Sequence, residues 1–213
     1  MTHELTHGVV SSTSNLAYRN ESGAIDESFS DFFGAMVDRD DWLIGDTLSL
    51  SGTYTRSMIN PTSKPRQRAH FSDLYRGSED KGGVHWNSGI QNRALYLIAE
   101  GLSSEGLGQS IGREKTEQIA FKTLIELSEN SRFIDAAAKM ISKAEELYPN
   151  SNLEKAAVEK AWSEVGVTLA DVPSVTVGER QFELPDGNDI VAFLYPRDGT
   201  ITRETMFSDE TYD

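Results

Sequence analysis

The stretch GAIDESFSDFFGAMV, residues 23–37, decides the fold class of this chain. Its large apolar side chains recur at i, i+4, i+7, i+8 and i+11, the spacing of a helix that buries one broad face. They are Ile25, Phe29, Phe32, Phe33 and Met36. Glu27 and Asp31 lie four residues apart on another side of the same helix. Such a pair of acids is either a solvated edge or two groups that act together at a site.

Helical patterns also dominate the sequence beyond this helix. Further helices are predicted over residues 87–99, 112–127, 131–147 and 151–165, and the Gly-, Pro- and Ser-containing stretch 42–83 is predicted to be loop-rich and to wrap the site. After residue 167, β-branched and aromatic runs alternate with Pro-Asp-Gly and Arg-Asp-Gly turns. We therefore predict a mainly α domain over 1–167, followed by a small β-rich extension over 168–213 whose role stays open.

The composition excludes several classes of partner. The net charge of −14 argues against binding to nucleic acid or to an anionic membrane. No apolar run is long enough for a membrane span, and no signal peptide is recognisable at the first residues. The chain has no cysteine, so any cross-link within the fold must come from metal ions. The sequence alone leaves a cytoplasmic location open.

The opening stretch MTHELTHGVV contains an H-E-x-x-H motif made of His3, Glu4 and His7. On a helix, residues four apart share a face, so both imidazoles can bind one zinc ion while Glu4 acts as general base toward its water. Glu27 is the candidate third ligand, and Asp31 could accept the second N–H of a ligand histidine. The structural alternative is a helix with one buried histidine and one solvated histidine.

Several separate motifs, in order along the chain, resemble the C-terminal helical domain of the thermolysin-like neutral zinc metallopeptidases. They are HELTH (3–7), NESGAIDESFSDFFG (20–34), RSMINP (56–61), GGVHWNSGIQNRALYLIAEG (82–101), IGREK (111–115) and AWSEVGV (161–167). The resemblance covers about residues 1–167. It implies a zinc metalloendopeptidase that hydrolyses bonds in a peptide or protein substrate, and a secreted, extracellular location.

The resemblance also implies roles for residues outside the zinc motif. His85 matches a histidine that stabilises the oxyanion, Asp80 matches the acid that orients it, and Tyr18 matches a tyrosine that shares the task. Arg56 matches an arginine that grips the substrate carbonyl. Considered one at a time, each has a more common structural role: His85 as a packed loop histidine, Tyr18 as a surface aromatic and Arg56 as an ion-pair partner.

A calcium site commonly follows the glutamate helix in this family. Asp38, Asp41 and Asp46 could supply oxygen ligands here, and the short loop favours one ion over two.

The family also has a β-rich N-terminal domain before the zinc helix, whereas this sequence starts at that helix. We therefore expect full activity to need that missing domain, supplied as a separate domain or chain that completes the cleft. A fragment, a split enzyme and a truncated gene product are all consistent with the sequence. The rival hypothesis is a non-catalytic, zinc-stabilised module that binds a protein partner.

Overall fold

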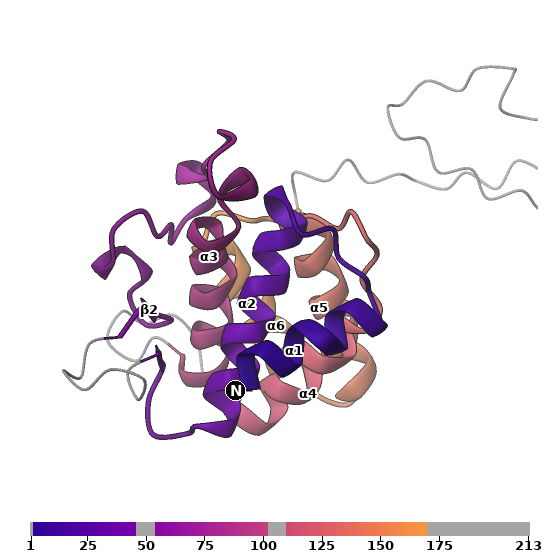
Figure 1. Cartoon of the computed structure of the whole chain (residues 1–213). Coiled ribbons are helices and arrows are strands. Elements are labelled where there is room, and N and C mark those ends of the chain that lie inside the picture. The colour runs from indigo at the N-terminus through magenta and orange to yellow at the C-terminus, as the bar shows by residue number, and fades with distance from the viewer. Residues whose placement is uncertain (1, 46–53, 102–109, 170–213) are drawn as a thin grey trace, which may run out of the picture. The chain divides into compact units, whose positions relative to one another are not determined.

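The structure is a computed structural model that describes residues 2–45, 54–101 and 110–169. Its helices are α1 (Thr2–Ser12), α2 (Asn20–Val37), α3 (Asp80–Glu100), α4 (Arg113–Leu124), α5 (Phe133–Leu147) and α6 (Leu153–Glu164). The predicted mainly α fold is thus confirmed (Figure 1). All but two residues of the predicted β-rich extension, 168–213, lie outside the described residues, so that part stays a prediction.

Helix α2 is the central element of the fold. It packs along α3 on one side and against α1 on another, while α5 packs between α4 and α6 (Figure 1). Every residue from 22 to 32 of α2 is buried, although only one face of this helix is apolar. The remaining buried positions are mostly serines and acids, so the alternative of a solvated acidic edge is wrong. Such groups are buried only where polar partners face them.

The apolar face of α2 forms the middle of one hydrophobic core. Ile25, Phe29 and Phe32 are fully buried there, and the Phe32 ring lies 6.2 Å from the Trp42 ring between centroids. The other helices contribute fully buried side chains, among them Ile90, Leu95, Ile98, Ile119, Leu124, Phe133, Met140 and Trp162. This core fixes the position of α2, and with it the position of the acids on its other face.

The helix predicted over residues 87–99 begins earlier than expected, at Asp80. Its first turn is irregular, because the backbone of Lys81, Gly82 and Gly83 is left-handed, with φ of 52°, 92° and 79°. A Cβ atom on Gly82 would lie 2.1 Å from the Asn20 side chain, so a glycine is required there by both conformation and space. The irregular turn places Asp80 beside the start of the regular helix.

Helices α4, α5 and α6 begin one or two residues later than predicted, and α4 and α6 end three residues and one residue earlier, whereas α5 ends at Leu147 as predicted and α2 begins three residues earlier than predicted. Helix α4 stops at Leu124 because the N–H groups of Glu126 and Leu127 bond to carbonyls three residues back, which tightens the chain into a turn.

The stretch 42–83 is irregular where the structure describes it, with two exceptions. Leu43–Ile44 (β1) and Arg56–Ser57 (β2) pair antiparallel, and Pro61–Ser63 (η1) and Phe71–Asp73 (η2) form 3-10 turns. The short pairing was not predicted, and it holds Arg56 against α2. No helix in the described ranges has the length and apolar character needed to cross a membrane.

Removing the Phe32 ring should test the role of the α2 core face. Phe32→Ala is expected to lower the free energy of unfolding by about 3–5 kcal/mol, because it leaves a cavity in a fully packed site. The matched control is Phe121→Ala, since Phe121 is 45% exposed and should cost less than about 1 kcal/mol. Urea unfolding followed by circular dichroism measures both, and equal losses would contradict the packing described here.

Candidate active site

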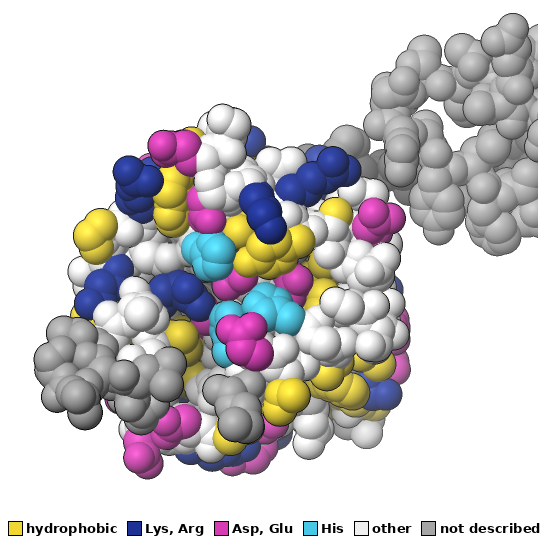
Figure 2. All heavy atoms as spheres, in the orientation of Figure 1, with side chains coloured by type: hydrophobic (Ala, Val, Ile, Leu, Met, Phe, Trp, Pro, Cys, Tyr) yellow, Lys and Arg dark blue, Asp and Glu magenta, His cyan; other side chains and the backbone are white. Residues whose placement is uncertain are grey.

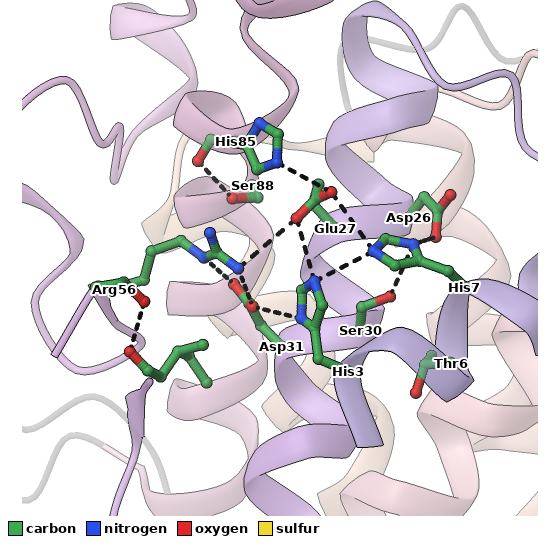
Figure 3. A network of polar contacts seen from close by, with 12 residues as sticks. His3, Thr6, His7, Asp26, Glu27, Ser30, Asp31, Arg56, His85 and Ser88 are labelled. Atoms are coloured by element: carbon green, nitrogen blue, oxygen red, sulfur yellow. Dashed lines mark hydrogen bonds and ion pairs between the residues drawn. The ribbon is translucent and has the colours of Figure 1, made fainter. Parts of the chain in front are cut away.

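Helices α1 and α2 bring His3, His7 and Glu27 together, as their spacing predicted (Figure 3). The two Nε2 atoms lie 3.2 Å apart, and each lies 3.5 Å from one carboxylate oxygen of Glu27. Two ligands at the usual zinc distances in a tetrahedral site are about 3.4 Å apart. The nearest oxygen is Oε2 for His3 and Oε1 for His7, and one ligand atom from each of the three residues lies within 4.8 Å of the other two, so the side chains come near the spacing of zinc ligands.

The second nitrogen of each imidazole is held by a buried carboxylate. His7 Nδ1 is hydrogen-bonded to Asp26 Oδ1 at 2.8 Å, whereas His3 Nδ1 lies 3.0 Å from Asp31 Oδ1 as an ion-pair contact without hydrogen-bond geometry. If each Nδ1 donates its proton, both Nε2 lone pairs point at the same place. Two lone pairs 3.2 Å apart repel each other unless a cation or proton lies between them. Since Glu27 Oε2 is also buried without a hydrogen bond, this donor set fits a zinc ion.

Protons can satisfy the same atoms when no metal is bound. Burial alone would lower the pKa of His3, but its contacts with Asp31 and Glu27 raise that pKa to about 9. The hydrogen bond to Asp26 raises the pKa of His7 despite partial burial. Burial alone would raise the pKa of Glu27, yet its contact with His3, its hydrogen bond from Tyr18 and nearby positive charges lower it. Protons and a metal ion therefore compete for the imidazole nitrogens.

Asp31 is the most heavily bonded side chain of the site. It accepts hydrogen bonds from Arg56 Nε at 2.7 Å and Nη2 at 2.6 Å, and from Asn92 Nδ2 at 2.9 Å, besides its contact with His3. Burial would raise the pKa of Asp31, but the Arg56 charge lowers it to about 2. Arg56 is thus anchored beside the ligands, with Nη2 3.7 Å from Glu27 Oε2.

Sequence reasoning missed two of these residues, Asp26 and Asn92. Asp26 directly precedes Glu27. The sequence feature that could have indicated its role is the four-residue spacing to Ser30, whose hydroxyl lies 3.2 Å from His7 Nδ1. Asn92 lies two helical turns after His85 on α3, so both share one face of that helix. Neither signal points to a site before the partner helix is known.

His85 and Tyr18 contact Oε1 of Glu27, whereas Arg56 approaches Oε2. His85 Nδ1 is 2.6 Å from Asp80 Oδ1, so Asp80 orients the ring. His85 Nε2 lies 3.3 Å from both the Tyr18 hydroxyl and Glu27 Oε1, and the Tyr18 hydroxyl donates to that same oxygen. Burial raises the pKa of Tyr18, so it stays a neutral donor. The four residues predicted from the resemblance are therefore gathered at the candidate ligands.

Two hollows meet at this cluster. The larger, of about 550 Å³, runs past Arg56 between the end of α2 and the β1–β2 pair, and the smaller, of about 370 Å³, is lined by His7, Tyr18 and Asp26. His3, Glu4, Glu27 and His85 line both. Histidine and acidic side chains are open to solvent at this place on the surface (Figure 2). Glu4 is exposed and thus accessible to a molecule spanning the two hollows.

The predicted calcium ligands are only partly described. Asp38 follows the end of α2, and Asp41 Oδ1 accepts a hydrogen bond from the Leu43 backbone at 2.7 Å. Asp46 lies outside the described residues. The calcium site therefore stays a prediction.

Comparison with known proteins agrees with this geometry. The family described as thermolysin metallopeptidase, alpha-helical domain, matches residues 14–167. The chain belongs to this family. Neutral protease B of Bacillus subtilis (strain 168) is 43% identical over 172 residues, and extracellular elastase of Staphylococcus epidermidis is 42% identical over 169. Each match covers 78% of this chain and 31% of the relative, so the chain spans about a third of their length.

Among solved structures, the chain is similar to the precursor of protealysin, a metalloproteinase from Serratia proteamaculans. It matches with a TM-score of 0.67 and 35% identity, covering 78% of this chain and 56% of that chain. The family match begins at residue 14, so it includes Glu27, Arg56 and His85 but not the H-E-x-x-H helix. The assignment of that helix to the candidate site is based on its H-E-x-x-H motif and on the distances given above.

The Asp31 network should dominate the stability of the metal-free chain. Asp31→Ala is expected to lower the free energy of unfolding at pH 7 by about 3–5 kcal/mol, because it leaves Arg56 buried without its carboxylate. The folded pKa of Asp31 is below its unfolded value, so its contribution is present above about pH 4 and is lost toward pH 2. Urea unfolding in chelator should show the difference from wild type shrinking over that range.

The control for this measurement is Asp73→Ala, because Asp73 is exposed and lies in a 3-10 turn away from the site. A loss below about 1 kcal/mol for Asp31→Ala, or a difference that grows on acidification, would contradict the proposed charge network.

Proposed function

We propose that this chain is the zinc-binding part of a metalloendopeptidase. His3, His7 and Glu27 would hold one zinc ion. The observation that carries the proposal is the pair of imidazoles whose Nδ1 atoms face buried carboxylates, while their Nε2 atoms lie 3.2 Å apart and 3.5 Å from the carboxylate of Glu27. Membership of the thermolysin metallopeptidase family supports the same activity.

Peptide hydrolysis needs a base, an electrophile and donors for the developing oxyanion. When bound, zinc would make an attacking water acidic enough to react near neutral pH and would polarise the substrate carbonyl. Glu4 is the base, because its carboxylate is exposed beside the ligands and lines both hollows. Asp26 accepts a hydrogen bond from His7 Nδ1 and Asp31 lies 3.0 Å from His3 Nδ1, so both acids favour the Nδ1-protonated imidazole whose Nε2 atom can bind metal.

Charge that develops on the carbonyl oxygen is stabilised by His85 and Tyr18. Both present a donor toward Glu27, and Asp80 fixes the ring of His85 so that its Nε2 faces the same place. Arg56 approaches the other oxygen of Glu27, is held by two hydrogen bonds to Asp31, and can donate to a substrate carbonyl in the larger hollow. Donors fixed before the reaction need no reorganisation during it.

The two hollows would hold an extended peptide on either side of the cleaved bond. The family relatives are longer than the matched region, and we propose that a further domain or chain supplies the second wall of the cleft. An extracellular location is proposed by analogy with the relative named extracellular elastase. No nucleic acid or membrane partner is proposed.

Zinc binding should depend on the ligand residues and on Asp26, which contacts the ligand His7. Wild type is expected to retain about one zinc after dialysis, while His7→Ala loses most of it. Asp26→Ala should weaken zinc binding about 10- to 100-fold, since it removes the partner of His7 Nδ1. Metal analysis and competition with a chromogenic chelator measure both effects.

The matched control for the histidine is His70→Ala, because His70 is exposed and bonds only within its own turn. Equal zinc retention by wild type and His7→Ala would show that the site assignment is wrong. If His7→Ala lost zinc but Asp26→Ala kept wild-type zinc affinity, the three ligands would be supported and the proposed role of Asp26 would be wrong.

Hydrolysis should depend on Glu4 and on a completed cleft. Glu4→Ala is expected to keep the zinc and lose at least about 100-fold in rate, since it removes the base and no ligand. Wild type alone should be slow on an unstructured protein substrate. Its rate should rise sharply when a family N-terminal domain is fused or added, because misplacement by about 1 Å can cost about 100-fold.

Three results separate the hypotheses for this domain. Full turnover by the isolated chain would contradict the proposal that a further domain or chain must complete the cleft. Equal rates for wild type and Glu4→Ala would remove Glu4 as base. A zinc-loaded chain that cleaves nothing, even with the added domain, would favour the non-catalytic interaction module.

A further inference from the structure

Two exposed cations stand beside the residues that would stabilise the oxyanion. The Lys81 ammonium lies 4.4 Å from the centroid of the Tyr18 ring. The Arg66 guanidinium lies 4.7 Å from the centroid of the Trp86 ring, and Trp86 directly follows His85. Both side chains are exposed, so their charge reaches solvent at the rim of the site.

Both cations occupy left-handed backbone, with φ of 52° at Lys81 and 69° at Arg66. This conformation is disfavoured for residues that carry a Cβ atom, and Gly, Asn and Asp adopt it most readily. Gly82 and Gly83 continue the left-handed turn in the expected way. The local backbone therefore favours neither lysine nor arginine at these positions, so their presence is better explained by the side chains.

The cations also stand out from the charge of the whole chain. Residues 54–93 contain seven Lys and Arg against three Asp and Glu, whereas the full sequence contains 20 against 34. Figure 2 shows Lys and Arg side chains bordering the histidines on this face. Among the described residues, Lys81 forms no ion pair. Arg66 forms one, in which its Nη1 lies 3.7 Å from Oε2 of the exposed Glu79. An acidic protein thus presents a basic rim at its candidate cleft.

We propose that Lys81 and Arg66 select peptides with an acidic side chain on the Tyr18 side of the cleaved bond. This inference rests on the proposed peptidase function and adds the substrate class. Tyr18 lines the smaller hollow, and the Lys81 ammonium covers one face of its ring, so this charge stands next to a side chain of that hollow. The aromatic faces hold both cations in place, which reduces the entropy lost when a carboxylate pairs with them.

The size of the preference follows from the exposure of both cations. Exposed ion pairs contribute little each, so we expect about a threefold gain per cation and about a tenfold gain together. The gain should appear in KM, because a rim charge binds the ground state and the transition state alike. It should fall with added salt, since the pairs are exposed to screening.

The test compares cleavage of matched peptides by the zinc-loaded protein with its cleft completed. A parent peptide carries Gln at each of three positions on both sides of the cleaved bond, and each test peptide replaces one Gln by Glu. Glu and Gln have the same shape, so the ratio of kcat/KM reports the charge alone. We expect a ratio of about ten at one or more positions on the Tyr18 side, and about one on the Arg56 side.

Variants assign the preference to the two cations. Lys81→Asn should reduce the ratio to about three, and the double variant with Arg66→Asn should reduce it to about one. Lys81→Arg keeps the charge and should keep most of the ratio. Lys122→Asn removes an exposed lysine of α4 far along the chain, so it serves as the control for net charge and should leave the ratio unchanged.

Each outcome decides between the ideas. Equal cleavage of Gln and Glu peptides by wild type overturns the selectivity and leaves the peptidase function standing. A ratio that survives in the double variant, or that Lys122→Asn reduces as much as Lys81→Asn, also overturns it. If Lys81→Asn slows both peptides equally, Lys81 only supports Tyr18 and the inference fails. Cleavage of neither peptide overturns the peptidase function and the selectivity with it.

Discussion

The site depends on one buried carboxylate, Asp31, which no solvent reaches. Arg56 of β2, His3 of α1 and Asn92 of α3 all contact it, so four elements meet at a single side chain of α2. A buried charge is tolerated only when partners replace its water, and removing one partner exposes the others to the same cost. The arrangement of the helices and the orientation of the candidate zinc ligand His3 are therefore set by the same contacts.

Helix α2 combines two demands that normally compete. Its apolar face builds the core, and its opposite face carries Asp26, Glu27 and Asp31 into a buried setting. Packed hydrophobic side chains on that second face would be at least as stable as paired charges. The acids are understandable only as parts of a site, because they hold the two imidazoles and Arg56. The core face thus supplies the rigidity on which the positions of the functional face depend.

The parts predictable from sequence were those set by local periodicity. The pairs His3 with His7 and Glu27 with Asp31 follow from helical spacing, and the helical class follows from the Ile25 to Met36 pattern. The partners Asp26 and Asn92, the left-handed turn before His85 and the β1–β2 pairing were not predictable in this way. Each depends on which helix or strand faces it, and that is decided by packing between distant segments. His85 and Tyr18 were found through the family resemblance and not through their spacing.

Charge balance explains why these residues occur together. Asp26, Glu27 and Asp31 bring three negative charges into a largely buried cluster, and Arg56 supplies one positive charge. Two further positive charges are needed, and a divalent cation bound to neutral imidazoles supplies them at the point where the Nε2 atoms meet. Without metal, a proton held between the two Nε2 atoms, which are 3.2 Å apart, supplies part of this positive charge, and the neighbouring carboxylates raise the pKa of both histidines. A zinc ion bound there would displace the proton from the Nε2 atoms, so in the proposed site the carboxylates and Arg56 would face positive charge both with and without metal.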